Sequence, residues 1–308
     1  MAVRGYALRA AELAGAAAGL ATSVVLLIAG CALLGVAAAG AGGAVVAIVI
    51  AVLLVVAVFA SCDRLALSAM LARPVSEVEQ PELYRLVREL SKAGRLPVPR
   101  LYLSPADQPN SFAVGRGPRT ATICCTEGLL RVLDEAELRG VLAHELAHVS
   151  SRDALASSVS AGLAIVITFP AGLARFARPG NSARSVAADS VASDRGSGLG
   201  LLESLLMLVF GPVAAIVVRL AVTREREYRA DASGALLSGD PVALAGALRK
   251  IDAGTAELAL APDGPRTSVG HLMIACPFRP EGFARLFLTH PPAGERIRRL
   301  EALAGYRR

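Results

Sequence analysis

The sequence predicts a mainly α-helical, polytopic membrane protein in which transmembrane helical hairpins carry a water-exposed α+β domain with a small sheet. Three observations support this fold class. The 308 residues are 54% hydrophobic, with a mean hydropathy of +0.52. Only 19% are charged, whereas soluble domains carry about 25%. Residues 13–62 contain no Asp, Glu, Lys or Arg. This composition excludes a disordered chain, a collagen-like fibre and a small disulfide scaffold.

The uncharged run from Leu13 to Cys62 is long enough for two membrane crossings, because one crossing takes about 20 helical residues. The segment Gly40-Ala41-Gly42-Gly43 divides the run, and glycine permits a tight reversal of the chain. We therefore predict spans near 13–38 and 44–62, which make residues 1–62 an N-terminal transmembrane hairpin. A cleaved signal peptide is the alternative, but its apolar core would run for only about 7–15 residues.

The arginines around this hairpin predict its orientation. Arg4, Arg9, Arg64 and Arg73 flank its open side, whereas the Ala/Gly turn carries no charge. Basic residues accumulate on the cytoplasmic side of a membrane, so both open ends are expected in the cytoplasm. The net charge of +6 is then explained by contact with anionic lipid. No basic stretch is interleaved with aromatic residues, so we expect a lipid bilayer as partner and no nucleic acid.

Residues 63–153 are expected to form the first part of the water-exposed domain. Apolar residues at helical spacing predict a helix over 79–92. Asp134, followed three residues later by Glu137, is typical of a capping box, so another helix is expected to begin there. Short apolar and β-branched runs predict strands at Arg100–Ser104, Ser111–Gly115 and Thr120–Thr126.

A second apolar hairpin is predicted at 154–222. Its two apolar stretches, 154–174 and 196–218, are separated by a segment rich in Ser, Gly, Arg and Asp. The remaining residues, 223–308, are polar again and form the second part of the domain. Helices are expected in it at Arg224–Gly234 and around Glu295–Leu303.

The segment His144-Glu145-Leu146-Ala147-His148 predicts the chemistry of the domain. Residues i and i+4 lie on one face of a helix, so both imidazoles can reach one metal ion. Glu145 lies about 100° around the helix from His144 and can act as a general base on a water molecule beside the ion. Two histidines with such a glutamate are typical of zincin hydrolases. The α+β domain is therefore predicted to be a zincin-like catalytic domain.

A catalytic zinc needs a third protein ligand and one open position. Glu227 and Asp231 are spaced i,i+4 on a predicted helix, so one could bind the metal while the other orients a ligating histidine. Spacing alone does not choose Glu227 over Glu225. A ligand from this helix requires the segments 154–174 and 196–218 both to span the membrane or neither to do so. The candidates are Asp153, Glu225, Glu227, Asp231, His271 and His290.

Several motifs follow one another along the chain. They are the N-terminal hairpin, Asn110-Ser111-Phe112-Ala113, Gly128-Leu129-Leu130, His144–His148 with Arg152-Asp153, Glu227-Tyr228-Arg229-Ala230-Asp231, and His290-Pro291-Pro292 with Arg296-Ile297. Together and in this order they resemble the HtpX-type, Ste24-related membrane zinc metallopeptidases, and the resemblance covers most of the chain. The sequence departs from that family at Ser111, where the family usually has Ala, and in a long segment at 178–198.

The resemblance implies one Zn²⁺ per chain, held by His144, His148 and Glu227, with Glu145 as the general base. It also implies supporting roles for Asp231, Asn110 and His290, the last two near the substrate or its transition state. As a catalytic residue, His290 could donate a hydrogen bond to the oxyanion. An edge strand at Asn110–Gly115 could pair with an extended substrate, backbone to backbone.

These features predict a zinc endopeptidase of the cell membrane, multi-pass, with its active site facing the cytoplasm. The expected substrates are polypeptides, in particular misfolded or damaged membrane proteins, in a quality-control role. Two other functions remain open. The chain could be a non-catalytic membrane scaffold with a vestigial zinc motif, or a signalling protease that releases a regulator.

Overall fold

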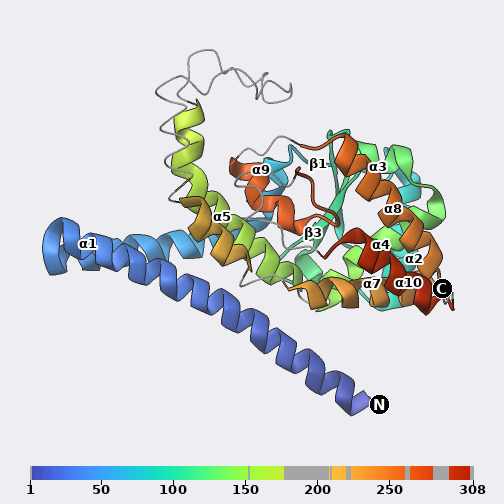
Figure 1. Ribbon diagram of the computed structural model, residues 1–308, viewed down its shortest axis with the longest axis horizontal. Helices are drawn as coiled ribbons and strands as arrows, with labels where there is room; N and C mark the ends of the chain where they lie inside the picture. Colours follow the sequence, from blue (N-terminus) through green and yellow to red (C-terminus); the bar gives the residue numbers. More distant parts are fainter. Residues whose placement is uncertain are drawn as a thin grey trace.

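The structure is a computed structural model that describes residues 2–151, 153–176, 208, 210–219, 223–260, 264–279 and 291–305. A long helical hairpin extends away from a domain of helices and one small sheet (Figure 1). The predicted mainly helical architecture with a small sheet is confirmed. The polar segment at 178–198, most of the apolar stretch at 196–218, and His290 lie outside the described residues.

The sheet has four strands in the order β1-β2-β4-β3. Strands β2 and β4 are parallel, and the outer pairs β1–β2 and β3–β4 are antiparallel. The three predicted strands are confirmed, with β4 starting two residues later than expected. Strand β1 was not predicted, because two residues that include a proline show no alternation. The strands are β1 (Arg73–Pro74), β2 (Arg100–Ser104), β3 (Ser111–Val114) and β4 (Thr122–Thr126).

Helices pack around this sheet to build the domain. The main core joins α2, α4 and α8 to the sheet through buried aliphatic side chains such as Leu86, Ile123 and Leu142. All four predicted helices of the domain are present. The domain's helices are α2 (Pro81–Gly94), α3 (Glu127–Val132), α4 (Glu135–Ser151), α7 (Arg224–Ser238), α8 (Pro241–Glu257), α9 (Gly264–Val269) and α10 (Ala293–Leu303), with 3₁₀ turns η1 (Pro118–Thr120) and η2 (Gly270–Leu272).

The capping box predicted for α4 is present. The backbone N–H of Glu137 donates to Asp134 Oδ1 at 2.9 Å, and the backbone N–H of Asp134 donates to Glu137 Oε2 at 3.0 Å. These two bonds satisfy donors that the first turn of a helix leaves without partners. Lys250 of α8 also donates to Glu137 Oε2, at 2.6 Å. The start of α4 is thereby fixed to the neighbouring helix.

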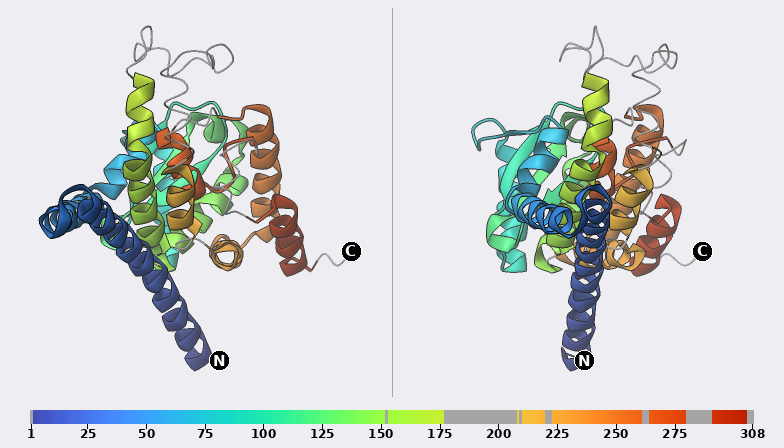
Figure 2. Two further views of the ribbon diagram at one scale, coloured as in Figure 1. Left: turned by 60° about the vertical axis from the view of Figure 1, so that its left-hand side comes forward. Right: turned by 90° about the vertical axis from the view of Figure 1, so that its left-hand side faces the viewer.

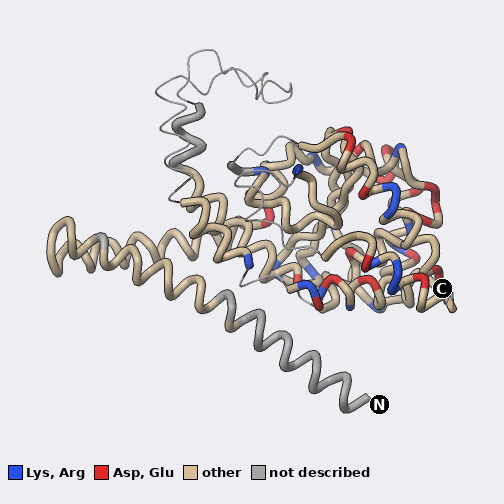
Figure 3. The backbone as a smooth tube through the Cα atoms, viewed as in Figure 1, with Lys and Arg blue, Asp and Glu red and all other residues tan. Residues whose placement is uncertain are grey.

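The N-terminal apolar run folds into a hairpin of two helical arms within α1 (Ala2–Ala69). The helix is broken at Ala39 and Gly40, where the backbone leaves helical geometry and Gly40 adopts a φ of +61°. The arm before the break touches the arm after it, since a Cβ on Gly35 would collide with the backbone carbonyl of Gly43. Figure 2 shows the reversal from two sides. In Figure 3 the tan part of the hairpin that extends away from the domain carries no Lys, Arg, Asp or Glu. The predicted reversal is confirmed.

The second apolar pair packs against the returning arm of α1. Helix α5 (Asp153–Phe176) leaves α4 at an angle of 88°. It forms a separate core with α1 and the short helix Phe210–Arg219, in which Val58, Leu163 and Val218 are buried. By length and composition, Gly35–Ala69 could cross a membrane. The bent pair α4–α5 would be a second candidate if it counted as one span.

Candidate metal centre

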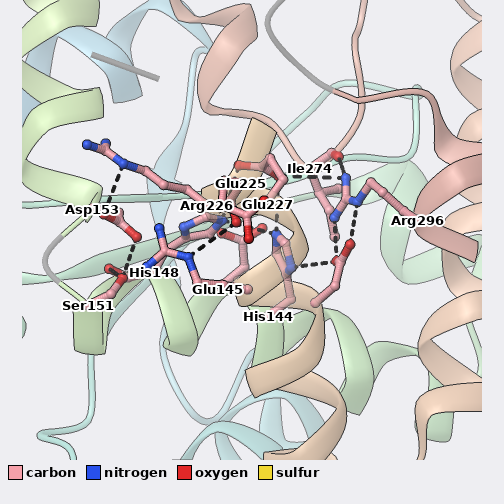
Figure 4. A network of polar contacts seen from close by, with 12 residues as sticks. His144, Glu145, His148, Ser151, Asp153, Glu225, Arg226, Glu227, Ile274 and Arg296 are labelled. Atoms are coloured by element: carbon pink, nitrogen blue, oxygen red, sulfur yellow. Dashed lines mark hydrogen bonds and ion pairs between the residues drawn. The ribbon is translucent and has the colours of Figure 1, made fainter. Parts of the chain in front are cut away.

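The two histidines of the predicted motif face a glutamate from a distant segment. His144 and His148 lie one turn apart on α4, and their Nε2 atoms are 3.2 Å apart. Glu227 of α7 places Oε1 3.5 Å from His148 Nε2 and Oε2 3.9 Å from His144 Nε2. One ligand atom from each residue lies within 4.8 Å of the others. Figure 4 shows the three side chains directed at one another.

A glycine allows α7 to come this close to α4. Glu227, Asp231 and Gly234 are spaced i, i+4 and i+7, so they lie on one face of α7. A Cβ on Gly234 would lie 2.8 Å from the backbone N of His144 and 2.9 Å from its Cα. The two helices therefore touch at Gly234, and this contact brings both carboxylates of the face to the histidines.

The environment of the three side chains fits a bound metal ion. His144 and Glu227 are buried, and His148 is only slightly exposed. Burial lowers the pKa of His148 to about 4, so its imidazole is neutral and able to bind a metal at pH 7. Two imidazole nitrogens and one carboxylate, converging in a buried place, match the donor set of a catalytic zinc site. The residues present therefore fit zinc.

Asp231 and Arg296 support His144 from behind. Asp231 Oδ1 lies 3.0 Å from His144 Nδ1, which favours a proton on Nδ1 and leaves Nε2 free to bind metal. Arg296 donates to both oxygens of Asp231, each at 2.7 Å, and is itself buried. Burial alone would raise the pKa of Asp231, but the Arg296 guanidinium outweighs it and the pKa falls to about 2. Asp231 is therefore a carboxylate at neutral pH.

Glu145 lies beside this cluster with its carboxylate held by a serine. It is 1% exposed, and Ser111 of β3 donates to its Oε1 at 2.6 Å. Burial raises the pKa of Glu145, while His144 and the Ser111 hydroxyl oppose that rise. A carboxyl with a raised pKa can take up and release a proton nearer to neutral pH than an exposed one. In the sequence, Ser111 stands out only as a departure from the Ala of the family. Its contact with Glu145 depends on how β3 packs on α4, which the sequence does not predict.

The family of the chain follows from comparison of the whole domain with known proteins. A sequence model of Peptidase family M48 matches residues 77–304, which include both site helices and Arg296. The chain belongs to this family.

The relatives of this chain include proteins named protease HtpX homolog. The one from Kineococcus radiotolerans is 56% identical over 244 residues, covering 79% of this chain and 80% of the relative. The one from Paenarthrobacter aurescens is 47% identical over 251 residues, covering 79% of each. The one from Syntrophobacter fumaroxidans is 44% identical over 241 residues, covering 78% of this chain and 83% of the relative. The resemblance inferred from the motifs is confirmed, and this M48 chain is a metallopeptidase.

Three other candidate ligands of this M48 peptidase, Glu225, Asp153 and His271, are not part of the metal cluster. Glu225 is exposed and lines a groove between α7 and α10. Asp153 accepts a hydrogen bond from Ser151 and lies 3.5 Å from Arg226. His271 is buried, with its Nε2 3.1 Å from the Ser160 hydroxyl. Geometry therefore favours Glu227 among the described candidates.

The structure gives Asn110 a set of partners within the chain. Asn110 is 1% exposed, and its amide donates to the backbone carbonyl of Ala275 at 3.0 Å. Next to it, Ile274 donates its N–H to the carbonyl of Ser111 at 2.9 Å, and Phe112 forms a bridge with Met273. The outer edge of β3 is thus covered at Ser111 and Phe112, where a substrate strand was expected. The substrate-binding role of Asn110 stays a prediction beside this packing role.

Proposed function

We propose that the chain is a zinc-dependent endopeptidase of the cell membrane whose active site faces the cytoplasm. The observation that carries the proposal is the convergence of His144, His148 and Glu227 within 4.8 Å, with Glu145 beside them. An M48 peptidase with this donor set has the parts that zinc-assisted peptide hydrolysis needs.

Each residue of the site has a distinct part in that reaction. His144, His148 and Glu227 would hold one zinc ion, which supplies Lewis acidity toward a water molecule and a peptide carbonyl. Glu145 accepts the proton of the attacking water and returns it to the leaving amine. Ser111 keeps one oxygen of Glu145 fixed by its hydrogen bond. Asp231 and Arg296 hold the ring of His144 in the orientation that binds metal. His290 is proposed, on the resemblance alone, to donate a hydrogen bond to the oxyanion of the transition state.

The apolar hairpins support the membrane placement. Large aliphatic side chains along α1 are exposed, among them Leu33, Leu53 and Val56, and such a surface is stable in lipid rather than in water. Because His148 and Glu227 meet in one site, the chain between them must cross the membrane an even number of times. We propose that the segments 154–174 and 196–218 both span, and that the arginines on the open side of the first hairpin keep the site in the cytoplasm.

The proposed substrates are misfolded or damaged membrane proteins. An active site tethered to the membrane by its own helices reaches the loops of neighbouring membrane proteins without diffusing through the cytoplasm. This favours a quality-control role over the digestion of soluble proteins. The alternatives to this role are a non-catalytic membrane scaffold with a vestigial zinc motif and a signalling protease that releases one regulator.

Proteolysis of an unstructured protein by the purified full chain in detergent tests the proposed chemistry. Glu145→Gln should lower kcat by about 10²–10⁴-fold, because general bases contribute this much. Glu225→Gln is the matched control, since Glu225 is an exposed glutamate near the site, and it should retain activity. Zinc removal should abolish cleavage, and added zinc should restore it. Equal cleavage by wild type and Glu145→Gln would refute the proposal.

A further inference from the structure

A second pocket lies where the membrane hairpin joins the domain, away from the metal cluster. It has a volume of about 470 Å³. The returning arm of α1 forms one wall, β2 forms another, and η1 with the connection before it closes the pocket. Its polar residues are Asp63, Arg64, Arg100, Tyr102, Arg116, Arg119 and Thr120.

The pocket carries an excess of positive charge. Four of its side chains are arginines and one is an aspartate. Asp63 is buried and lies 3.4 Å from Arg100, so these two charges offset each other. Within the described part of the chain, Arg64, Arg116 and Arg119 take part in no ion pair. Three exposed guanidinium groups around one pocket form a site for an anion, and their planar forks match phosphate oxygens.

The place of the pocket along α1 points to lipid as the source of that anion. The uncharged run of the hairpin ends at Cys62, and the charged residues that α1 gives to the pocket, Asp63 and Arg64, come directly after it. In a membrane-inserted hairpin this position is the level of the lipid headgroups.

The apolar wall of the pocket continues along the hairpin. Ala60 lines the pocket, and Val56, Leu53 and Val49 follow it at helical spacing along the same face of α1. All three are more than half exposed. A lipid bound with its phosphate in the pocket would therefore find an apolar stripe for its acyl chain. A free phosphate ion would make no use of this stripe.

We propose that this pocket binds the phosphate headgroup of an anionic phospholipid from the cytoplasmic leaflet. Tyr102, which is half-buried beside the arginines, has the amphipathic side chain that suits this level of a membrane. The bound lipid would fix the angle between hairpin and domain, because the pocket draws its residues from both. This inference rests on the proposed membrane placement but not on the proposed catalysis.

Lipid binding to the purified full chain in detergent, measured by native mass spectrometry, tests the proposal. The probes are phosphatidylglycerol and phosphatidylcholine, with inorganic phosphate as a competitor. Phosphatidylglycerol should bind roughly tenfold more tightly than phosphatidylcholine. Arg116→Gln with Arg119→Gln should weaken phosphatidylglycerol binding by about fivefold for each arginine. Arg64→Gln alone should weaken it about fivefold, which keeps the test valid if the double variant does not fold.

The matched control is Arg88→Gln with Arg131→Gln, which removes the same charge from two exposed arginines that are paired with Glu77 and Asp107. This control should bind lipid like the wild type, and so should Glu145→Gln, which separates the lipid site from the peptidase chemistry. Equal affinity for both lipids, or equal losses in the pocket variants and the control, would overturn the proposal. Displacement of the lipid by inorganic phosphate at similar concentration would reduce the pocket to an ion site and would also overturn it.

Discussion

The two ring nitrogens of His144 have different partners. Its Nε2 faces His148 and Glu227, and its Nδ1 lies 3.0 Å from Asp231. The carboxylate at Nδ1 selects the tautomer whose Nε2 can bind metal. The i,i+4 spacing of the histidines could be predicted from the sequence, because helix geometry alone determines it. Spacing could not choose Glu227 over Glu225, because the choice depends on which side of α7 faces α4; only the family resemblance implied Glu227.

Glu227→Ala tests the third ligand. Removal of one of three protein ligands should lower the zinc content of the purified protein from about one ion per chain to well below it. Metal analysis after dialysis measures this. Glu225→Ala is the control and should keep its zinc, because Glu225 is exposed. If the Glu227 variant kept its zinc and the Glu225 variant lost it, the assignment would be wrong.

Asp231→Asn tests the support of His144. The amide keeps the shape of the side chain but removes the carboxylate that pairs most closely with the buried Arg296, whose Nη1 also lies 3.7 Å from Glu227 Oε2. We expect zinc affinity to fall by about 10–100-fold and the free energy of unfolding to fall by about 3–5 kcal/mol. Competition with a chelator and denaturant unfolding measure the two effects. Unchanged zinc affinity in a folded variant would show that Asp231 does not position His144.

At the scale of elements, the contact between α4 and α7 builds the site. Local signals predicted both helices and the capping box at Asp134. The covering of β3 by Met273 and Ile274 has no local signal, because those residues lie about 160 positions away in the sequence. Strand β1 is too short to show a pattern. The sequence therefore could not predict the long-range packing that decides which distant segments contact one another.

Gly234→Ala tests whether close helix packing positions the metal ligands. The new methyl group would lie 2.8 Å from the backbone N of His144, so α7 must move away from α4. We expect a loss of about 1–3 kcal/mol in the free energy of unfolding, together with weaker zinc binding. Ser233→Ala is the control, because Ser233 is the exposed neighbour on the same helix. Stability and zinc affinity equal to those of the control would refute the role given to Gly234.

At the scale of the whole molecule, a hairpin without charges is joined to a charged domain (Figure 3). Composition predicted this division and the reversal at Gly40. The orientation in a membrane is still a proposal that rests on the placement of arginines. The arrangement of the second apolar pair could not be predicted in detail, because its packing on α1 depends on contacts such as Gly162 with Val58.

Single cysteines in intact cells test the orientation. Gly42→Cys lies in the turn of the hairpin, where a Cβ has no neighbour within 4 Å, and a membrane-impermeant maleimide should label it from outside. Val78→Cys, on the domain at a position that is 95% exposed, should be labelled only after lysis. The wild type reports the background from its own cysteines. The reverse pattern would place the active site outside the cytoplasm.

The central claim is that two imidazoles of α4 and the Glu227 carboxylate of α7 hold one zinc ion. X-ray absorption at the zinc edge of the purified wild-type chain tests it most directly. We predict about one zinc per chain, with two imidazole nitrogens at about 2.0–2.1 Å and oxygen ligands at about 2.0–2.2 Å. A sulfur ligand at about 2.3 Å, or zinc well below one ion per chain, would contradict the account.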